Sequence, residues 1–423
     1  MGNVYIHRNS NNIILNPDQT DFEVVERKFR GHPDSIADMV AQSFTQKYIH
    51  HAWKTFPELS NQYFPNFSAD KVVLSGASGK FAGGKYVMTK PIDALLIGKI
   101  TQRIGDVTID VDKIFEASLE EILSRCLGHD NYKNHLVRKT YSASLAGTDH
   151  DKGFYDPFSV DNLLDILKTE THANDTVFVV AYSPLSVSEK LTIYLDNLTA
   201  SDVFRNKYPE IGSDIKVMIR RRASNFEITM CLPVFPEKVS DSLVYEQIIK
   251  SAKDFLLEKI EEFILSNAKF FGSSVVKLHI NTKDTADKKY YAIWGTSLSK
   301  GDIGAVGRGN RQQGFISGLR PSTNEAMSGK NPNHFAGIIY QLVAEQISQQ
   351  IYVETGSRNA VFITANNGDA LASPNSIDIV LEQSERDIEV VNNISEKTLN
   401  SIPELRSNFI NSDPYSRFMK SNI

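Results

Sequence analysis

The chain of 423 residues is poor in cysteine: it contains only Cys126 and Cys231, and they do not form a CxxC pair. This scarcity argues against a disulfide framework and against a structural zinc site built on paired cysteines. We expect both cysteines to pack in the core, because free cysteine behaves as a small hydrophobic residue.

The sequence also lacks long apolar runs and flexible linkers. No apolar run approaches the roughly 18 residues that are needed to cross a bilayer. The first residues, MGNVYIHRNSNN, do not have the charged and apolar segments of a signal peptide. No stretch rich in proline or serine marks a flexibly tethered domain. We therefore expect a cytosolic protein with no membrane partner.

The sequence also lacks an excess of basic residues. The formal net charge is −5, and 41% of the residues are hydrophobic, which is enough for a sizeable core. A nucleic-acid partner is not expected, because a protein that binds nucleic acid usually presents a basic surface. Any anionic ligand must instead be met by a local cluster of basic side chains.

Three segments have the apolar spacing of helices. In residues 36–50, apolar side chains recur at four-residue steps from Ile36 to Tyr48, directly after GHPDS, where Asp34 or Ser35 is the expected cap. Further helices are expected at 243–265 and at 334–353, the second ending near Gly356.

Short runs rich in β-branched and aromatic residues predict strands. They cover residues 72–76, 177–182, 226–232, 275–281, 290–295 and 376–382. Strands and helices do not alternate regularly, which favours an α+β fold with sheets covered on one face by helices.

Five short stretches combine turn-forming residues with charge: GHPDS (31–35), HANDT (172–176), GSDIKVM (212–218), GDIGAVGRGNRQQG (301–314) and SGKNP (328–332). Each has an ordinary structural explanation as a helix start, a turn, a strand, a glycine-rich hairpin or a loop. Taken alone, Asp175 of HANDT is expected to be a turn residue. The run Arg220-Arg221-Arg222 that follows GSDIKVM is expected on a solvated face.

The same stretches also have the chemistry of an anion site. His32 and Asp34 at a helix start are suited to phosphate and metal. Lys216 lies in an apolar run, where a lysine needs an anionic partner.

In the stretch 301–314, closely spaced glycines let backbone N–H groups approach an anion, and Arg308 supplies a planar fork for phosphate oxygens. The stretch matches neither a Walker loop nor a dinucleotide fingerprint. Asp302 would repel an anion and fits the cationic or sugar side of a ligand, whereas Lys330 in SGKNP offers another phosphate contact. Together these residues suggest a polyphosphate that shares its charge with Mg2+, and ATP is the obvious candidate.

In order and spacing, these motifs resemble the archaeal-type S-adenosylmethionine synthetases (methionine adenosyltransferases). The resemblance covers roughly residues 20 to 365, through GHPDSIAD, ANDT, YSPLS, GSDIKVM, GTS…GDxGAVGRGNRxxG and SGKNP. It implies three similar, interleaved α+β subdomains. The approximate boundaries are 1–30 with 186–296 for the N-terminal subdomain, 31–147 with 297–339 for the central one, and 148–185 with 340–423 for the C-terminal one.

The resemblance also implies a reaction and an assembly. The thioether sulfur of L-methionine would attack C5' of ATP and expel triphosphate, which is then cleaved to pyrophosphate and phosphate. Mg2+ is required in the family, and many relatives also use K+. The expected assembly is a homodimer with active sites at the interface, and whether dimers pair into a tetramer is left open.

Residue by residue, the resemblance assigns roles to the motifs. His32 would lie near the breaking C5'–O bond, and Lys216, Arg308 and Lys330 would bind the triphosphate. Asp34, with Glu26 as a weaker choice, would hold Mg2+. The remaining residues that would bind ATP or methionine are Asp175, Asp302, Gly307, Gly309, Asn310, Ser328, Gly329 and Asn331.

Several positions depart from the family pattern. A segment that usually carries a glutamine reads YSASLAG (141–147), and Lys85 and Ile303 stand where acids are usual. Ile338 replaces a lysine, and TANNG (364–368) replaces the usual SQIG. The departures concern amino-acid recognition more than triphosphate binding. Two alternatives therefore stay open: an adenosyltransferase that uses another thioether or amino acid, and a weakly active paralogue that regulates an active synthetase.

Overall fold

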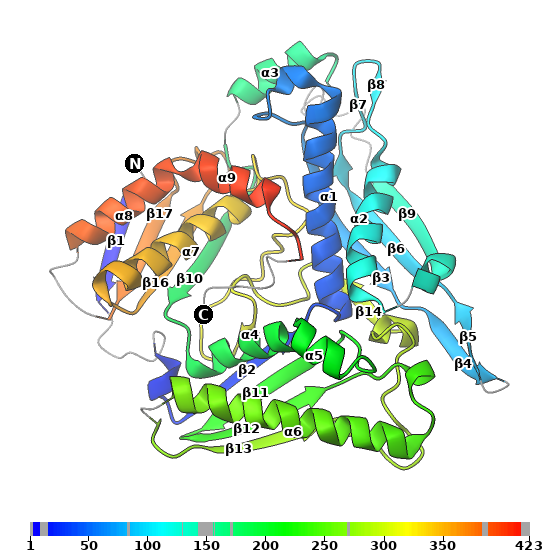
Figure 1. The fold of residues 1–423 in the computed structure, drawn as a ribbon. Helices are drawn as coiled ribbons and strands as arrows, with labels where there is room; N and C mark the ends of the chain where they lie inside the picture. Colours follow the sequence, from blue (N-terminus) through cyan, green and yellow to red (C-terminus); the bar gives the residue numbers. More distant parts are fainter. Residues whose placement is uncertain are drawn as a thin grey trace.

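The computed structural model describes residues 3–8, 16–82, 85–128, 130–142, 155, 157–169, 172–268, 271–382 and 388–415. Within these ranges the chain forms three units, each a sheet with helices packed on it (Figure 1). No helix in this described part is both long and apolar enough to span a membrane.

The first sheet has the strand order β13-β12-β11-β2-β15. Its strands are β2 (Phe22–Lys28), β11 (Lys216–Arg222), β12 (Asn225–Cys231), β13 (Val275–Ile280) and β15 (Ile316–Ser317). The helices α4 (Val187–Ala200), α5 (Asp202–Lys207) and α6 (Ser242–Asn267) share its hydrophobic core. The strands β12 and β13 are parallel, whereas β11 is antiparallel to both of its neighbours.

The second sheet has the order β14-β3-β6-β9. It contains β3 (Phe67–Ser75), β6 (Ile92–Ile100), β9 (Leu136–Ser142) and β14 (Ile303–Ala305), and α1 (Pro33–Thr55) and α2 (Val111–Cys126) pack against it. Two small ribbons adjoin it, formed by β4 (Ser78–Ala82) with β5 (Lys85–Lys90) and by β7 (Arg103–Ile104) with β8 (Val107–Thr108).

The third sheet has the order β1-β17-β16-β10. It contains β1 (Asn3–Arg8), β10 (Val177–Ser183), β16 (Asn359–Ala365) and β17 (Ser376–Leu381), with α7 (Ala336–Thr355), α8 (Ile388–Asn400) and α9 (Ile402–Asn411) on one side. The short helix α3 (Val160–Thr169) lies near the C-terminal end of α1 (Figure 1).

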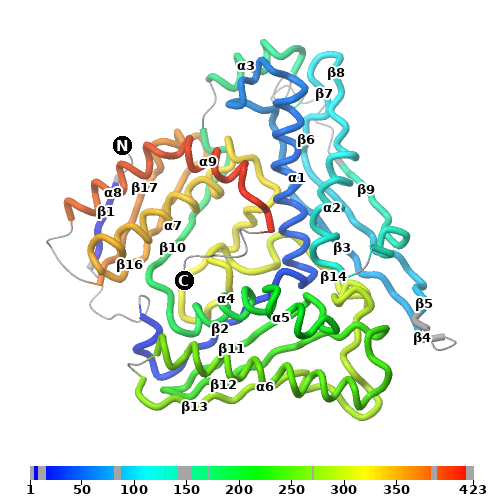
Figure 2. The backbone as a smooth tube through the Cα atoms, viewed as in Figure 1, coloured from blue at the N-terminus to red at the C-terminus, as the bar shows by residue number. Residues whose placement is uncertain are grey.

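The three units are interleaved along the chain. Figure 2 shows strands of distant colours side by side, such as blue β2 beside green β11 and green β10 beside orange β16. The predicted α+β class, with mixed sheets covered on one face by helices, is confirmed. The subdomain boundaries stay a prediction. Two strands pair outside their predicted groups: β1, from the predicted N-terminal subdomain, pairs with β17, and β15, from the predicted central subdomain, pairs with β2.

Local predictions succeed where periodicity is strong. The helices predicted at 243–265 and 334–353 correspond to α6 and α7, and α7 ends at Gly356 with a φ of 71°. The predicted strand at 290–295 is wrong: the segment makes turns and a single bridge at Tyr291. Its apolar side chains are used for packing instead, since Trp294 is fully buried and its indole N–H donates to Asn131.

Three other expectations need correction. His32 caps α1 instead of Asp34 or Ser35: its Nδ1 accepts from the Asp34 backbone N–H. Arg221 is fully buried, because Pro17, Thr20 and Ala223 supply carbonyl oxygens and Glu23 supplies a carboxylate. Cys126 is buried as expected, but Cys231 is only half-buried.

Candidate active site

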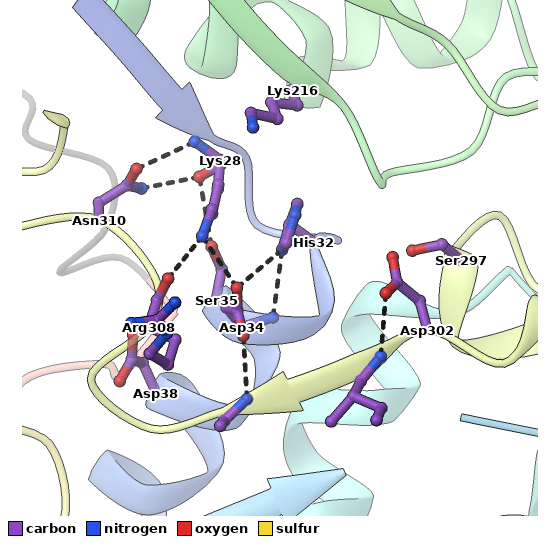
Figure 3. Close-up of polar contacts among 12 residues, drawn as sticks. Lys28, His32, Asp34, Ser35, Asp38, Lys216, Ser297, Asp302, Arg308 and Asn310 are labelled. Atoms are coloured by element: carbon purple, nitrogen blue, oxygen red, sulfur yellow. Dashed lines mark hydrogen bonds and ion pairs between the residues drawn. The ribbon is translucent and has the colours of Figure 1, made fainter. Parts of the chain in front are cut away.

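The stretches GHPDS, GSDIKVM and GDIGAVGRGNRQQG meet where β2 ends, α1 begins and β14 crosses (Figure 3). The end of β2 delivers Lys28, and four residues later His32 caps α1. Because α1 is packed on nearly all sides, its first turn is held in a fixed place.

Lys28 connects the end of β2 to α1 and to the glycine-rich loop. Its Nζ lies 2.9 Å from Asp34 Oδ2 and donates to the carbonyl oxygen of Arg308 at 2.6 Å. Its backbone N–H and C=O pair with the Asn310 side chain at 2.9 and 2.7 Å. These contacts fasten the glycine-rich loop to the end of β2 (Figure 3).

Asp34 joins the start of α1 to β14. Its Oδ1 accepts from the backbone N–H of Ala305 at 3.0 Å. The contact requires a glycine next to it, because a Cβ on Gly304 would lie 2.0 Å from the carbonyl oxygen of Pro33. The glycine therefore allows strand and helix backbones to approach closely.

His32 is neutral in this environment. Burial lowers the pKa of His32 to about 4, and the nearby Asp34 opposes that effect only in part. Since Nδ1 accepts from the Asp34 backbone N–H at 3.2 Å, the ring proton is assigned to Nε2. The ring thus offers an N–H donor without a formal charge.

Asp38 lies one helical turn after Asp34, on the same face of α1. Its Oδ1 accepts from the backbone N–H of Gly307 at 2.8 Å. Burial raises the pKa of Asp38 to about 7, although the N–H groups of Gly307 and Gly309 act in the opposite direction. The loop glycines therefore direct N–H groups at a carboxylate of the same chain.

Lys216 finds the anionic partner that its apolar surroundings require. Its Nζ lies 3.0 Å from Glu26 on the neighbouring strand β2. Both residues line a cavity of about 520 Å³. Part of its wall is apolar and is formed by Met218, Met230 and Tyr290.

Asp302 and Arg308 lie on opposite sides of the His32 ring (Figure 3). Asp302 is exposed, and its Oδ1 accepts from the Ile303 backbone N–H at 3.1 Å. The Arg308 side chain is also exposed, and its guanidinium makes no hydrogen bond or ion pair with the described residues. It is therefore available to an anion.

Lys330 belongs to a second cluster. Its Nζ forms an ion pair with Asp70 on β3, not with the residues around His32. Gly329 has a φ of 86° and would place a Cβ 2.3 Å from the carbonyl oxygen of Ala69, so it is held tightly beside this strand. Lys330 is thus held at β3, whereas the first cluster, formed by Lys28, His32, Asp34, Asp38 and the loop residues Arg308 and Asn310, is held where β2 meets α1.

Other predicted site residues lie near this second cluster. The exposed Asp175 lies near Glu325, whose pKa is raised by burial and by the Asp175 charge. Ser328 and Glu325 line a small cavity together with Gly307. Asn331 is buried and donates to Asn66, so it stabilises the loop.

Two residues of the first cluster were missed by the sequence reasoning, Lys28 and Asp38. The signals were present: Lys28 has the same strand parity as Glu26, and Asp38 is four residues after Asp34 in a helix. Residues 83–84 and 143–147, which include parts of FAGGK and YSASLAG, lie outside the described residues. Among the residues with described positions, no group of three or more His, Cys, Asp or Glu could hold a metal ion by itself.

Comparisons with known proteins agree with this arrangement of motifs. Residues 3–413 match the model of the S-adenosylmethionine synthetase (AdoMet synthetase) family. The chain is 31% identical over 352 residues to an S-adenosylmethionine synthase of Sulfolobus acidocaldarius, covering 82% of both chains. It is 33% identical over 361 residues to one of Methanothermobacter marburgensis, covering 80% of this chain and 81% of the relative.

A solved structure supports the fold. An unusual S-adenosylmethionine synthetase from Campylobacter jejuni matches with a TM-score of 0.56 at 12% identity, over 95% of this chain and 99% of that one. Together, the family match and the archaeal relatives show that the chain belongs to the archaeal-type S-adenosylmethionine synthetase family of methionine adenosyltransferases.

Proposed function

We propose that this protein forms S-adenosylmethionine from ATP and L-methionine by attack of the thioether sulfur on C5' of the ribose. The observation that carries this proposal is the convergence of the neutral donor His32, Lys216 and the available Arg308 guanidinium around the start of α1. A thioether is already nucleophilic, so the reaction needs alignment and stabilisation of a departing polyanion more than a general base.

The cavity beside Lys216 supports a nucleotide substrate. Its volume of about 520 Å³ and its apolar wall at Met218, Met230 and Tyr290 suit a nucleoside. Lys216 lies in the lining, where it can exchange Glu26 for a phosphate oxygen. The C5'–O bond would then lie between the nucleoside wall and the triphosphate contacts.

His32 would stabilise the leaving oxygen. With Nδ1 occupied by the Asp34 backbone N–H, Nε2–H is the free donor. A hydrogen bond from Nε2–H would strengthen as negative charge builds on the oxygen that leaves C5'. Lys28 and Asn310 would keep the loop that carries Arg308 in place.

The donor set fits Mg2+ that arrives with ATP. Mg2+ is commonly held by one or two carboxylates together with substrate phosphates, so a full cage of protein ligands is not needed. Asp34 Oδ2 already faces a cation, the Lys28 ammonium at 2.9 Å, and would be one ligand. Glu26 is the second predicted ligand. Its carboxylate would become available for Mg2+ when Lys216 leaves their ion pair and binds a phosphate oxygen. Bound Mg2+ would neutralise charge that develops on the triphosphate.

The direct test follows the products. Purified protein is incubated with ATP, Mg2+ and methionine, and both the sulfonium product and phosphate are measured. Formation of S-adenosylmethionine supports the proposal. Triphosphate cleavage without the sulfonium product would indicate another nucleophile, and absence of both reactions would favour a regulatory paralogue.

We further infer that each site is completed by a second copy of the chain. This inference is supported by Lys330, whose ammonium pairs with Asp70, whereas that of Lys216 pairs with Glu26. If Lys330 reaches the triphosphate from the partner, Lys216→Ala and Lys330→Ala chains should complement each other. After subunit exchange in a 1:1 mixture, about a quarter of wild-type activity should return, because half of the dimers then hold one intact site. A mixture as inactive as its components would contradict a shared site.

A further inference from the structure

The cavity beside Lys216 carries a surplus of positive charge. Its lining contains five lysines, at positions 216, 283, 288, 289 and 300, but only two acids, Glu26 and Asp284. This local excess is opposite in sign to the formal net charge of −5. A cavity lined mostly by one sign of charge concentrates its field and attracts ligands of the other sign.

Two of these lysines have carboxylate partners. Lys216 pairs with Glu26 at 3.0 Å, inside the cavity. Lys289 is almost buried, with 8% of its side chain exposed, and pairs with Glu246 at 2.6 Å. These two lysines therefore add little net charge to the cavity while their partners stay in place.

The other three lysines, Lys283, Lys288 and Lys300, form the cationic rim. All three are exposed, and none forms an ion pair with the residues that the structure describes. The remaining acid of the lining, Asp284, accepts a hydrogen bond of 2.5 Å from the Tyr245 hydroxyl. The positive surplus of the cavity is therefore concentrated at the cationic rim.

The cationic rim is continuous with the apolar wall. The Nζ of Lys300 lies 5.3 Å from the ring centroid of Tyr290, which lines the same cavity. Burial, followed by repulsion from Lys288, lowers the pKa of Lys300. The repulsion between two such positive charges decreases when an anion binds between them.

We propose that the cationic rim captures the polyphosphate of an incoming nucleotide and guides it into the cavity toward Lys216. The proposal rests on the function proposed above and adds residues that set the apparent affinity for ATP without taking part in bond cleavage. Electrostatic capture raises association rates by about 10- to 1,000-fold and weakens steeply as salt is added. At about 0.1 M salt such charges act over roughly 10 Å.

The test is charge reversal of the exposed rim. In the variant Lys283→Glu/Lys288→Glu, the KM for ATP should rise about tenfold at low ionic strength, while kcat and the KM for methionine stay within about twofold. The difference from wild type should shrink as NaCl is added at constant K+. The matched control is Lys250→Glu/Lys397→Glu, since both lysines are exposed on α6 and α8 and lie outside the cavity.

A binding measurement separates this proposal from the proposed function. Titration calorimetry with inorganic tripolyphosphate, without methionine, should give weaker binding to the rim variant than to the control variant, most clearly at low salt. Equal effects of the two variants, or a salt-independent rise in KM, would overturn the role of the rim. A wild-type protein that forms no sulfonium product but binds tripolyphosphate through the rim would overturn only the proposed function.

Discussion

At the scale of single residues, Arg308 is distinguished by a fixed backbone and, within the described part of the chain, an unengaged guanidinium. Its backbone is fixed by Lys28, whereas its guanidinium has no partner among the described residues. A side chain held in this way can bind an anion without first breaking an internal ion pair. Lys216, in contrast, must give up Glu26.

We expect Arg308→Ala to lower kcat by about 100- to 1,000-fold, which is the usual cost of losing a donor to developing negative charge. The KM for methionine should change by less than about threefold. Arg308→Lys keeps the charge but loses the planar fork, so its kcat should lie between those of wild type and Arg308→Ala. Steady-state kinetics with both substrates provide the measurement, and a loss confined to methionine KM would contradict the assignment.

Gly304 is a second residue whose role is defined by contact distances. A Cβ there would lie 2.0 Å from the Pro33 carbonyl oxygen, so Gly304→Ala should push β14 away from α1 and break the Asp34–Ala305 hydrogen bond. We expect activity to fall by at least about tenfold, because small displacements of catalytic groups are costly. The control is Gly318→Ala, whose new Cβ would meet its nearest atom at 3.4 Å. Similar activity of the two variants would refute this explanation.

At the scale of elements, residues 413–415 act as a clamp on the loop before α1. Asp413 accepts two hydrogen bonds from Arg125 of α2, at 2.6 and 2.8 Å. The Tyr415 ring lies 4.1 Å from the Arg125 guanidinium carbon and 5.3 Å from that of Arg30. Since Arg30 immediately precedes Gly31-His32, the end of the described chain is tied to the loop that positions His32.

Removing this clamp should loosen the molecule. Tyr415→Leu keeps an apolar side chain but loses both cation–π contacts, and we expect it to lower the free energy of unfolding by about 1 to 2 kcal/mol. Tyr415→Phe keeps the aromatic ring and should resemble wild type. Thermal unfolding followed by circular dichroism checks both variants, and equal melting temperatures for all three proteins would exclude a clamp.

At the scale of the whole molecule, a buried charge network links β2, α4 and Arg320 within the first unit, and Arg320 also contacts the ring of Tyr182 on β10 in the third unit. Arg320 binds both oxygens of Glu189 at 3.0 and 3.1 Å, and Ser186 donates to Glu23 at 2.5 Å. Burial, together with the neighbouring Glu189 charge, raises the pKa of Glu23 to about 7. Arg221 faces the same carboxylate at 3.6 Å.

This network predicts a pH dependence of stability. Between its unfolded pKa of about 4.5 and its folded pKa of about 7, Glu23 keeps a proton in the folded state that it loses on unfolding. The free energy of unfolding should therefore fall as pH rises through this window, by about 2 kcal/mol. Urea unfolding at pH 5 to 8 should show a weaker pH dependence for Glu23→Gln. The control, Glu261→Gln at an exposed position of α6, should show the pH dependence of wild type. The same change of unfolding free energy with pH in all three proteins would contradict the prediction.

Features that depend on local order could be predicted from the chain alone. Periodic apolar residues defined α6 and α7, and glycines beside charges marked the loops that meet at α1. Such signals are readable because a helix or a turn is specified by residues close together in the chain.

Which of these residues come together depends on the folded chain. It brought Lys28 to Asp34 and Asn310, buried Arg221 within a set of carbonyl oxygens, and held Lys330 at Asp70. The reason is that the Lys28–Asn310, Arg221–Pro17 and Lys330–Asp70 contacts each join residues more than 200 positions apart. The energy of a charge depends on the partners and the burial that it meets there. A local pattern can mark such a residue, as strand parity marks Lys28, but it does not identify the partner.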